Sequence, residues 1–131
     1  MAPAAARTIS DFLNDTCTKP QDYDLILTGD LGFTGTELLY EVMEKEYKIK
    51  VKGYHKDCGM LIYDLKKQDV NSGGSGCGCS GSVLCSHIMK RMEQGSLNRV
   101  LFVATGALMS PTSNKQGNPI LGIAHAVLLE A

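Results

Sequence analysis

The stretch Asp24-Leu-Ile-Leu-Thr-Gly-Asp30 decides the fold class of this chain. Residues 24–28, with three large apolar residues at their centre, predict a short buried strand, and Gly29 ends it. Leu38, Leu39, Val42 and Met43 then repeat at helical spacing. A buried strand that leads into an amphipathic helix predicts an α/β layer pattern.

The elements around this stretch follow from the same periodicities. A helix is predicted over about Thr8 to Cys17, ended before Pro20. Thr34 and Glu37 have the spacing of a capping box, which predicts a helix from there to about Tyr47. Residues 47–51 are expected to enter a strand, and residues 57–64 fit either a short strand or a helical turn.

The second half of the chain predicts a helix and two strands. The helix begins at about Ser80, carries apolar residues from Val83 to Met92 on one face and ends at Gly95. Residues 99–104 form an apolar strand, residues 105–119 a loop, and residues 120–130 a last strand that pairs antiparallel with 99–104. The strand 24–28 is expected at an open edge, so a missing half or a second copy should cover it.

Composition limits the kind of protein. The chain has 131 residues, enough for one domain, and 44% of them are hydrophobic against 21% charged. The formal net charge of -1 argues against nucleic acid as a partner. No apolar run reaches the length of a membrane span, and residues 1–7 lack the pattern of a signal peptide. The five cysteines are therefore expected to be free thiols in a reducing compartment.

The glycine-rich segment 72–81 contains Gly76-x-Gly78-x-x-Gly81. This matches the dinucleotide fingerprint only formally, because the next strand does not end in an acidic residue. No Lys-Ser or Lys-Thr pair follows, so a phosphate loop is excluded as well. Two interpretations remain equally open: amides at the start of a helix that bind an anion, or a tight turn needed only for packing.

Cysteine and aspartate suggest further chemistry beside this segment. Cys77 and Cys79 lack the paired spacing of zinc frameworks, and no histidine arrangement that would activate either thiol is evident. Small buried thiols are the simpler interpretation. Asp30 follows a strand at the edge where α/β proteins bind ligands, although an Asx turn explains it equally well. Asp57 could reach the same crevice or cap a helix.

Several strings resemble the stage V sporulation protein AD family, over nearly the whole chain. They are residues 23–32, 57–63, 68–80, 103–111 and 122–127. The resemblance implies a thiolase-like protein of endospore formers, implicated in moving dipicolinic acid into the developing spore as part of a membrane-associated channel assembly. It also implies that residues 1–131 are a single C-terminal half-domain of an αβαβα layered fold, a mixed sheet with covering helices, whose N-terminal half is absent.

The thiolase-like superfamily implies where catalysis would reside. Its condensing enzymes place a histidine where this chain has Gly29 or Asp30, and an asparagine near Cys77; their nucleophile lies in the other half. Glycine and cysteine cannot polarise a thioester carbonyl, and aspartate would repel a developing oxyanion. We therefore expect a protein that is not an enzyme and needs no cofactor.

The expected function is binding of dipicolinic acid, alone or as its calcium chelate, at the cytoplasmic face of the forespore inner membrane. Asp30 or Asp57 would supply oxygen to the calcium. Partners would be other spore membrane channel proteins, and the missing half or a second copy. Two alternatives stay open: an acyltransferase that uses a cysteine of the glycine-rich loop, and a purely structural docking subunit. The candidate ligand site comprises Asp30, Gly32, Asp57, Cys58, Gly76, Cys77, Gly78, Cys79 and Ser80.

Overall fold

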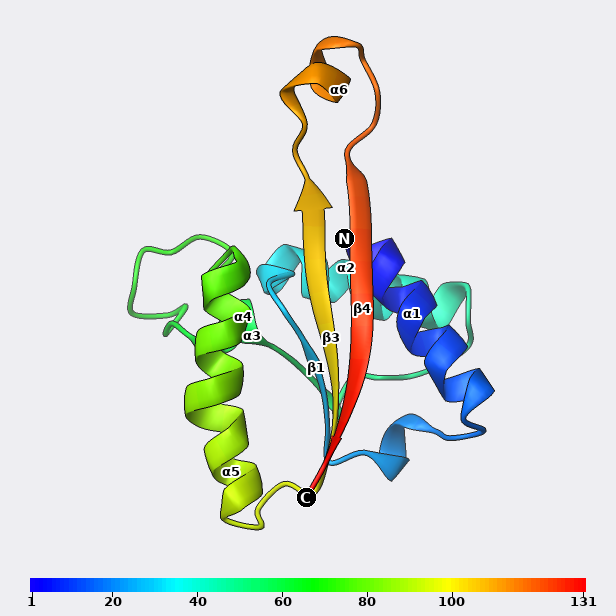
Figure 1. Cartoon of the computed structure of the whole chain (residues 1–131), viewed down its shortest axis with the longest axis vertical. Helices are drawn as coiled ribbons and strands as arrows, with labels where there is room; N and C mark the ends of the chain where they lie inside the picture. Colours follow the sequence, from blue (N-terminus) through cyan, green and yellow to red (C-terminus); the bar gives the residue numbers. More distant parts are fainter.

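The computed structural model describes residues 1–131 and shows one four-stranded sheet with helices on both faces (Figure 1). Its strands are β1 (Leu25–Thr28), β2 (His55–Asp57), β3 (Arg99–Leu108) and β4 (Leu121–Glu130), in the order β2-β1-β3-β4. β1 pairs in parallel with β2 and β3, and β3 pairs antiparallel with β4. The predicted α/β class, mixed sheet and final antiparallel pair are confirmed.

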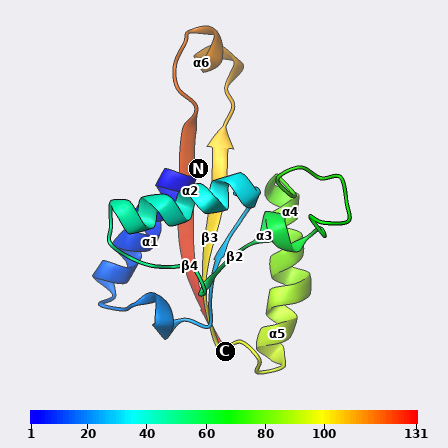
Figure 2. The ribbon, with the colours of Figure 1, turned by 180° about the vertical axis from the view of Figure 1, so that it is seen from behind.

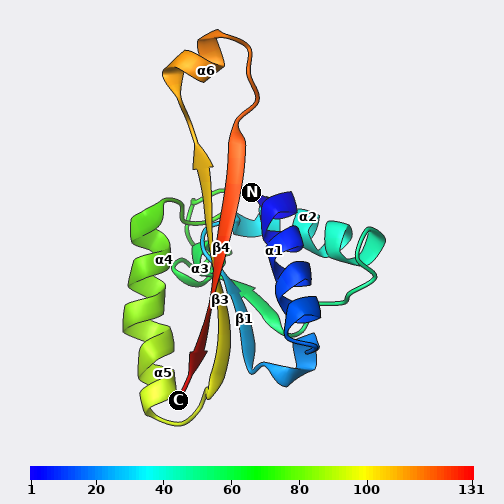
Figure 3. The same ribbon diagram turned by 45° about the vertical axis from the view of Figure 1, so that its right-hand side comes forward.

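The helices form two layers. α1 (Ala2–Asp15) and α2 (Gly32–Lys45) lie on one face of the sheet, and α3 (Cys58–Leu61) follows β2 (Figure 2). The opposite face is covered by a continuous helical run (Figure 3). This run comprises α4 (Cys77–Val83), a π-helical turn (Leu84–Ile88) and α5 (Met89–Glu93). A short helix, α6 (Pro111–Lys115), closes the β3–β4 hairpin, which projects beyond the rest of the molecule (Figure 1).

Two apolar clusters hold these layers together. On the first face, Ile9 and Leu13 of α1 pack with Ile26 of β1 and Leu101 of β3. The cluster on the other face sets Val83, Ile88 and Met92 against Leu27 and Val100. All four residues of β1 are buried because each of its faces meets one of the clusters. Burial on both faces explains why the sequence of this strand is apolar without alternation.

The first two predicted elements differ from the structure in position. The predicted helix 8–17 begins earlier, at Ala2, with Pro3 in its first turn. Its alanines were not informative, because small residues pack closely against β4 without giving a pattern of large apolar side chains. The expectation of an edge position for residues 24–28 is wrong. β1 is an inner strand, because β2 and β3 flank it.

The predicted capping box is also wrong. α2 already begins at Gly32, so Thr34 lies inside the helix, and no side chain of the helix caps it. Asp57 from β2 accepts the amides of Leu31 and Gly32 instead, and Ser72 accepts the next two amides of the helix. Residues 47–51 form no strand, and residues 57–64 hold the end of β2 followed by α3, so both alternatives for that segment are partly realised.

Later boundaries shift by a few residues. The helix expected from Ser80 begins at Cys77, and α5 ends at Glu93, close to the predicted stop at Gly95, whose φ of +68° suits glycine. The predicted loop 105–119 instead contains the last four residues of β3 and all of α6. Ten-residue pairing with β4 extends β3 outward, because antiparallel partners satisfy each other's backbone groups without needing a core.

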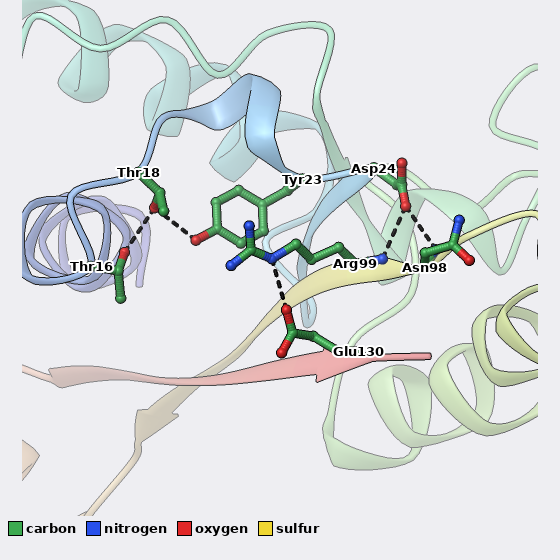
Figure 4. Close-up of polar contacts among 7 residues, drawn as sticks. All are labelled: Thr16, Thr18, Tyr23, Asp24, Asn98, Arg99 and Glu130. Atoms are coloured by element: carbon green, nitrogen blue, oxygen red, sulfur yellow. Dashed lines mark hydrogen bonds and ion pairs between the residues drawn. The ribbon is translucent and has the colours of Figure 1, made fainter.

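Arg99 stabilises the end of the sheet at which β1 and β3 begin, opposite the β3–β4 hairpin (Figure 4). Its guanidinium lies 5.0 Å from the centre of the Tyr23 ring, and its Nε lies 3.0 Å from Glu130 at the end of β4. The Nε–H is not aligned for a hydrogen bond, so this contact is an ion pair. Asp24 accepts the amides of Asn98 and Arg99, at 2.7 and 2.9 Å, and both bonds lower the pKa of its carboxyl. These contacts stabilise the sheet away from the candidate ligand site.

Candidate functional site

Asp30 organises the edge of the sheet where the parallel strands end. Its backbone amide donates to the hydroxyl of Thr105 on β3, and that hydroxyl donates to Asp30 Oδ1, both at 2.9 Å. Asp30 Oδ2 accepts the amide of Gly76 at 2.7 Å and the hydroxyl of Ser75 at 3.4 Å. The half-buried carboxylate therefore ties the glycine-rich loop to β1 and β3. The structure thus brings Asp30 and Gly76 of the predicted set together.

Asp57 lies inside the protein, at the wall of a separate hollow lined by Tyr40 and His55 that does not include Asp30. It is 1% exposed, and its Oδ1 accepts the Thr28 hydroxyl at 2.6 Å. The amides of Leu31 and Gly32 donate to its two oxygens at 2.9 Å each. Burial raises the pKa of this carboxyl, and the hydrogen bonds that it accepts oppose the rise. Of the two functions open for Asp57, helix capping is the one that the geometry shows.

A chain of polar side chains behind Asp57 was missed by the sequence analysis. Thr28 Oγ1 lies 2.8 Å from His55 Nε2, and His55 Nδ1 lies 3.1 Å from the Tyr40 hydroxyl. His55 is 6% exposed, and burial lowers its pKa to about 4. One signal could have found it: His55 and Asp57 are two residues apart, and strand residues at that spacing share a face.

The cysteines divide between interior and surface. Cys58 is fully buried, and burial, followed by the negative charge of Asp57, raises the pKa of its thiol to about 12. Cys79 is buried as well, and burial and then the charges of Asp57 and Asp30 raise its thiol pKa. Cys77 is exposed at the start of α4. A raised pKa keeps a thiol protonated and unreactive, so the local electrostatics disfavour Cys58 and Cys79 as nucleophiles.

The glycines near this edge serve two different purposes. A Cβ on Gly59 would lie 2.5 Å from the carbonyl oxygen of Gly74, and a Cβ on Gly74 would lie 2.6 Å from Ile62. These residues are glycine because the loop passes directly over α3. By contrast, a Cβ on Gly76, Gly78 or Gly81 would meet nothing within 4 Å. Only the first part of the glycine-rich segment is therefore explained by packing within this chain.

The remaining predicted site residues fall on both sides of this division. Gly32 is buried, with its amide given to Asp57, while Gly76, Cys77 and Gly78 are exposed and Ser80 is half-buried. No group of three His, Cys, Asp or Glu residues could hold a metal ion. The substantial hollows of the surface are lined by other residues than Asp30 and 76–80. The site is thus an open polar edge, with backbone of the glycine-rich loop on its rim.

Fold and site together define a layered α/β protein whose candidate site lies at the carboxyl ends of parallel strands. Comparison with known proteins specifies the family. The chain belongs to the Stage V sporulation protein AD family, whose model matches residues 1–130. It is 49% identical over 131 residues to Stage V sporulation protein AD of Bacillus subtilis (strain 168). The match covers 99% of this chain and 38% of that relative, so the chain spans less than half of its length.

The family resemblance predicted from the sequence is confirmed by these matches. None of the helices combines the length and the apolar character that crossing a bilayer requires.

Proposed function

We propose that this chain is a non-catalytic part of a stage V sporulation protein AD that binds dipicolinic acid, alone or as its calcium chelate, at the edge organised by Asp30. The observation that carries the proposal is the joining of the glycine-rich loop to the ends of β1 and β3 by one carboxylate. Backbone amides at the start of a helical run suit a carboxylate ligand. Cys77, Gly78 and Ser80 lie on this rim, and the chain's membership of the family supports the sporulation role.

Charge favours the calcium chelate over the free dianion. Segments 28–32, 57–59 and 72–80 contain no lysine or arginine, whereas Asp30 is negative and half-buried there. A free dicarboxylate would meet repulsion from Asp30, while a bound calcium ion would reverse the sign of that interaction. Asp30 is the one oxygen donor of the predicted pair that the surface can reach, because Asp57 is enclosed.

A thermal melt tests this proposal. Ligand at about a hundredfold excess over its dissociation constant stabilises the folded state by about 2.7 kcal/mol, provided that it binds only that state. We expect millimolar dipicolinate with calcium to raise the midpoint, and Asp30→Asn to abolish the rise. Asp69→Asn is the matched control, since this exposed carboxylate forms no hydrogen bond or ion pair and should keep the full shift. A cooperative melt that ignores dipicolinate, with and without calcium, would place binding outside this chain.

We further propose that the face formed by α4, α5 and β4 docks another part of the assembly. β4 exposes three large apolar side chains: Leu121 at 67%, Ile123 at 51% and Val127 at 53%. A group of exposed apolar side chains on one strand is typical of an interaction surface. Gly78 and Gly81 on the adjacent helical run face open space. Glycine on an exposed helical surface lets a second helix approach closely. The residues that the Bacillus subtilis relative carries beyond the matched 38% are the proposed occupant.

Sedimentation of the purified chain mixed with that remaining part of the relative tests the docking face. We expect a one-to-one complex that Val127→Lys weakens at least tenfold. Phe33→Lys provides a matched control, because Phe33 on α2 is equally exposed, at 53%, but lies on the other side of the sheet. Equal weakening by both substitutions would contradict the assignment of the face. Self-association without the added part, abolished by Val127→Lys alone, would replace the proposed occupant with a second copy.

The rival enzymatic function, acyl transfer through a loop cysteine, makes a different prediction. An acyltransferase should have one thiol that is alkylated far faster than the others at neutral pH. Under the binding proposal, Cys77 should react no faster than the exposed Cys17 on the opposite side of the molecule.

A further inference from the structure

Three side chains form a hydrogen-bonded chain that ends on Asp57, and the carboxylate of Asp57 sets the order of donors and acceptors along it. We name Tyr40, His55, Thr28 and Asp57 the relay. The Asp57 carboxylate can only accept, so Thr28 must give it the hydroxyl proton over their 2.6 Å contact. The Thr28 oxygen is then left to accept from His55 Nε2, at 2.8 Å. A neutral His55 ring that donates from Nε2 accepts the Tyr40 hydroxyl proton at Nδ1. This arrangement satisfies all three contacts with the ring protonated on Nε2.

We propose that the relay is a conformational latch, which fixes the amino terminus of α2 and, through Asp30, the glycine-rich loop. Its inner end is Asp57, whose oxygens hold two successive amides at the start of α2. Those amides belong to Leu31 and Gly32, which directly follow Asp30. Asp30 in turn holds Gly76 at 2.7 Å. Displacement of Asp57 therefore releases the turn from which Asp30 reaches the loop, and Ser72 of the same loop, which accepts the amides of Phe33 and Thr34, carries the change directly from α2.

The outer end of the latch is at the surface. Tyr40 is half-buried on α2 and lines an open hollow of about 620 Å³ on the outer face. The Tyr40 ring stands edge-on to the His55 ring, with 5.4 Å between the centroids. Lys52 Nζ lies 5.8 Å from the centre of the Tyr40 ring. The relay thus connects a surface hollow beside α2 with the loop on the far side of β1. A molecule that displaces Tyr40 would loosen the loop, which makes the relay a regulatory device.

Removal of the Thr28 hydroxyl is the direct test, because Thr28→Val keeps the side-chain shape. In the unliganded wild-type chain, nitrogen-15 NMR spectra should show the His55 ring protonated on Nε2. In Thr28→Val this preference should disappear, and amide exchange at Leu31, Gly32 and Gly76 should accelerate about tenfold, as expected for a lost hydrogen bond to a charged group. Thr28→Ser should restore both the tautomer preference and the slow exchange of the three amides. Thr8→Val is the control, because it removes a 2.9 Å hydrogen bond to Ala124 elsewhere.

A second variant keeps the latch testable if Thr28→Val does not fold. Tyr40→Phe removes only the hydroxyl from a half-buried ring, and it should shift the His55 tautomer and the Gly76 amide together. Tyr47→Phe should shift neither, because the Tyr47 hydroxyl forms no hydrogen bond within the chain. Change confined to His55, with Leu31 and Gly76 unaffected in these variants, would overturn the latch, and so would Nδ1 protonation in the wild type. The test needs no ligand, so its failure would leave the proposed function standing.

Discussion

Gly81→Ala should stabilise the isolated chain, which is an unusual result for a glycine in a glycine-rich segment. Gly81 lies inside α4 with a helical backbone, and a Cβ there would meet nothing within 4 Å. Alanine is favoured over glycine in a helix interior by about 0.8 to 1.0 kcal/mol, because glycine loses more backbone entropy on folding. We therefore expect the free energy of unfolding to rise by about 0.8 kcal/mol and the melting midpoint by about 3 °C.

Urea denaturation followed by circular dichroism measures this change as a shift of the midpoint at constant slope. Gly59→Ala is the matched control, since its Cβ would lie 2.5 Å from the Gly74 carbonyl and 2.9 Å from Asp57 Oδ2. That variant should lose about 1 to 3 kcal/mol through overpacking. Destabilisation by Gly81→Ala in the isolated chain would refute the reasoning, because it would mean that the chain itself occupies the space beside Gly81. Stabilisation of the chain together with weaker docking would locate the reason for this glycine in the partner.

Three further predictions concern ionisation and the sheet. The lowered pKa of His55 means that the unfolded chain binds the extra proton between pH 6.5 and about 4. Stability from this residue is therefore complete above pH 6.5 and falls by about 3 kcal/mol towards pH 4, a loss that urea titrations should show and that His55→Gln should remove. Alkylation of the native chain followed by mass spectrometry should modify the three exposed thiols and leave Cys58 and Cys79 protected until urea is added. Arg99→Gln removes the partly exposed ion pair with Glu130 and the contact with Tyr23, and it should lower the free energy of unfolding by about 1 kcal/mol, measured by urea melts in low salt.

The sequence alone was sufficient for the fold class, the family and the antiparallel ending of the sheet. The apolar residues of 24–28 and 99–104 indicated buried strands, and the helices were recognised by their different period of apolar residues. Asp30 was found because it directly follows such a strand. These inferences succeeded because they depend on residues that are close in sequence.

Contacts between distant segments decided what the sequence could not. Thr34 and Glu37 have the local pattern of a cap, yet Asp57 from β2 supplies the cap, because strand pairing brings its carboxylate to the start of α2. Sequence spacing likewise gives no sign that Asp57 is enclosed while Asp30 stays accessible, since burial depends on which helices cover each strand end. The relay from Tyr40 to Asp57 is the clearest case. Its members come from α2, β1 and β2, so only the tertiary structure places their donors and acceptors within bonding distance.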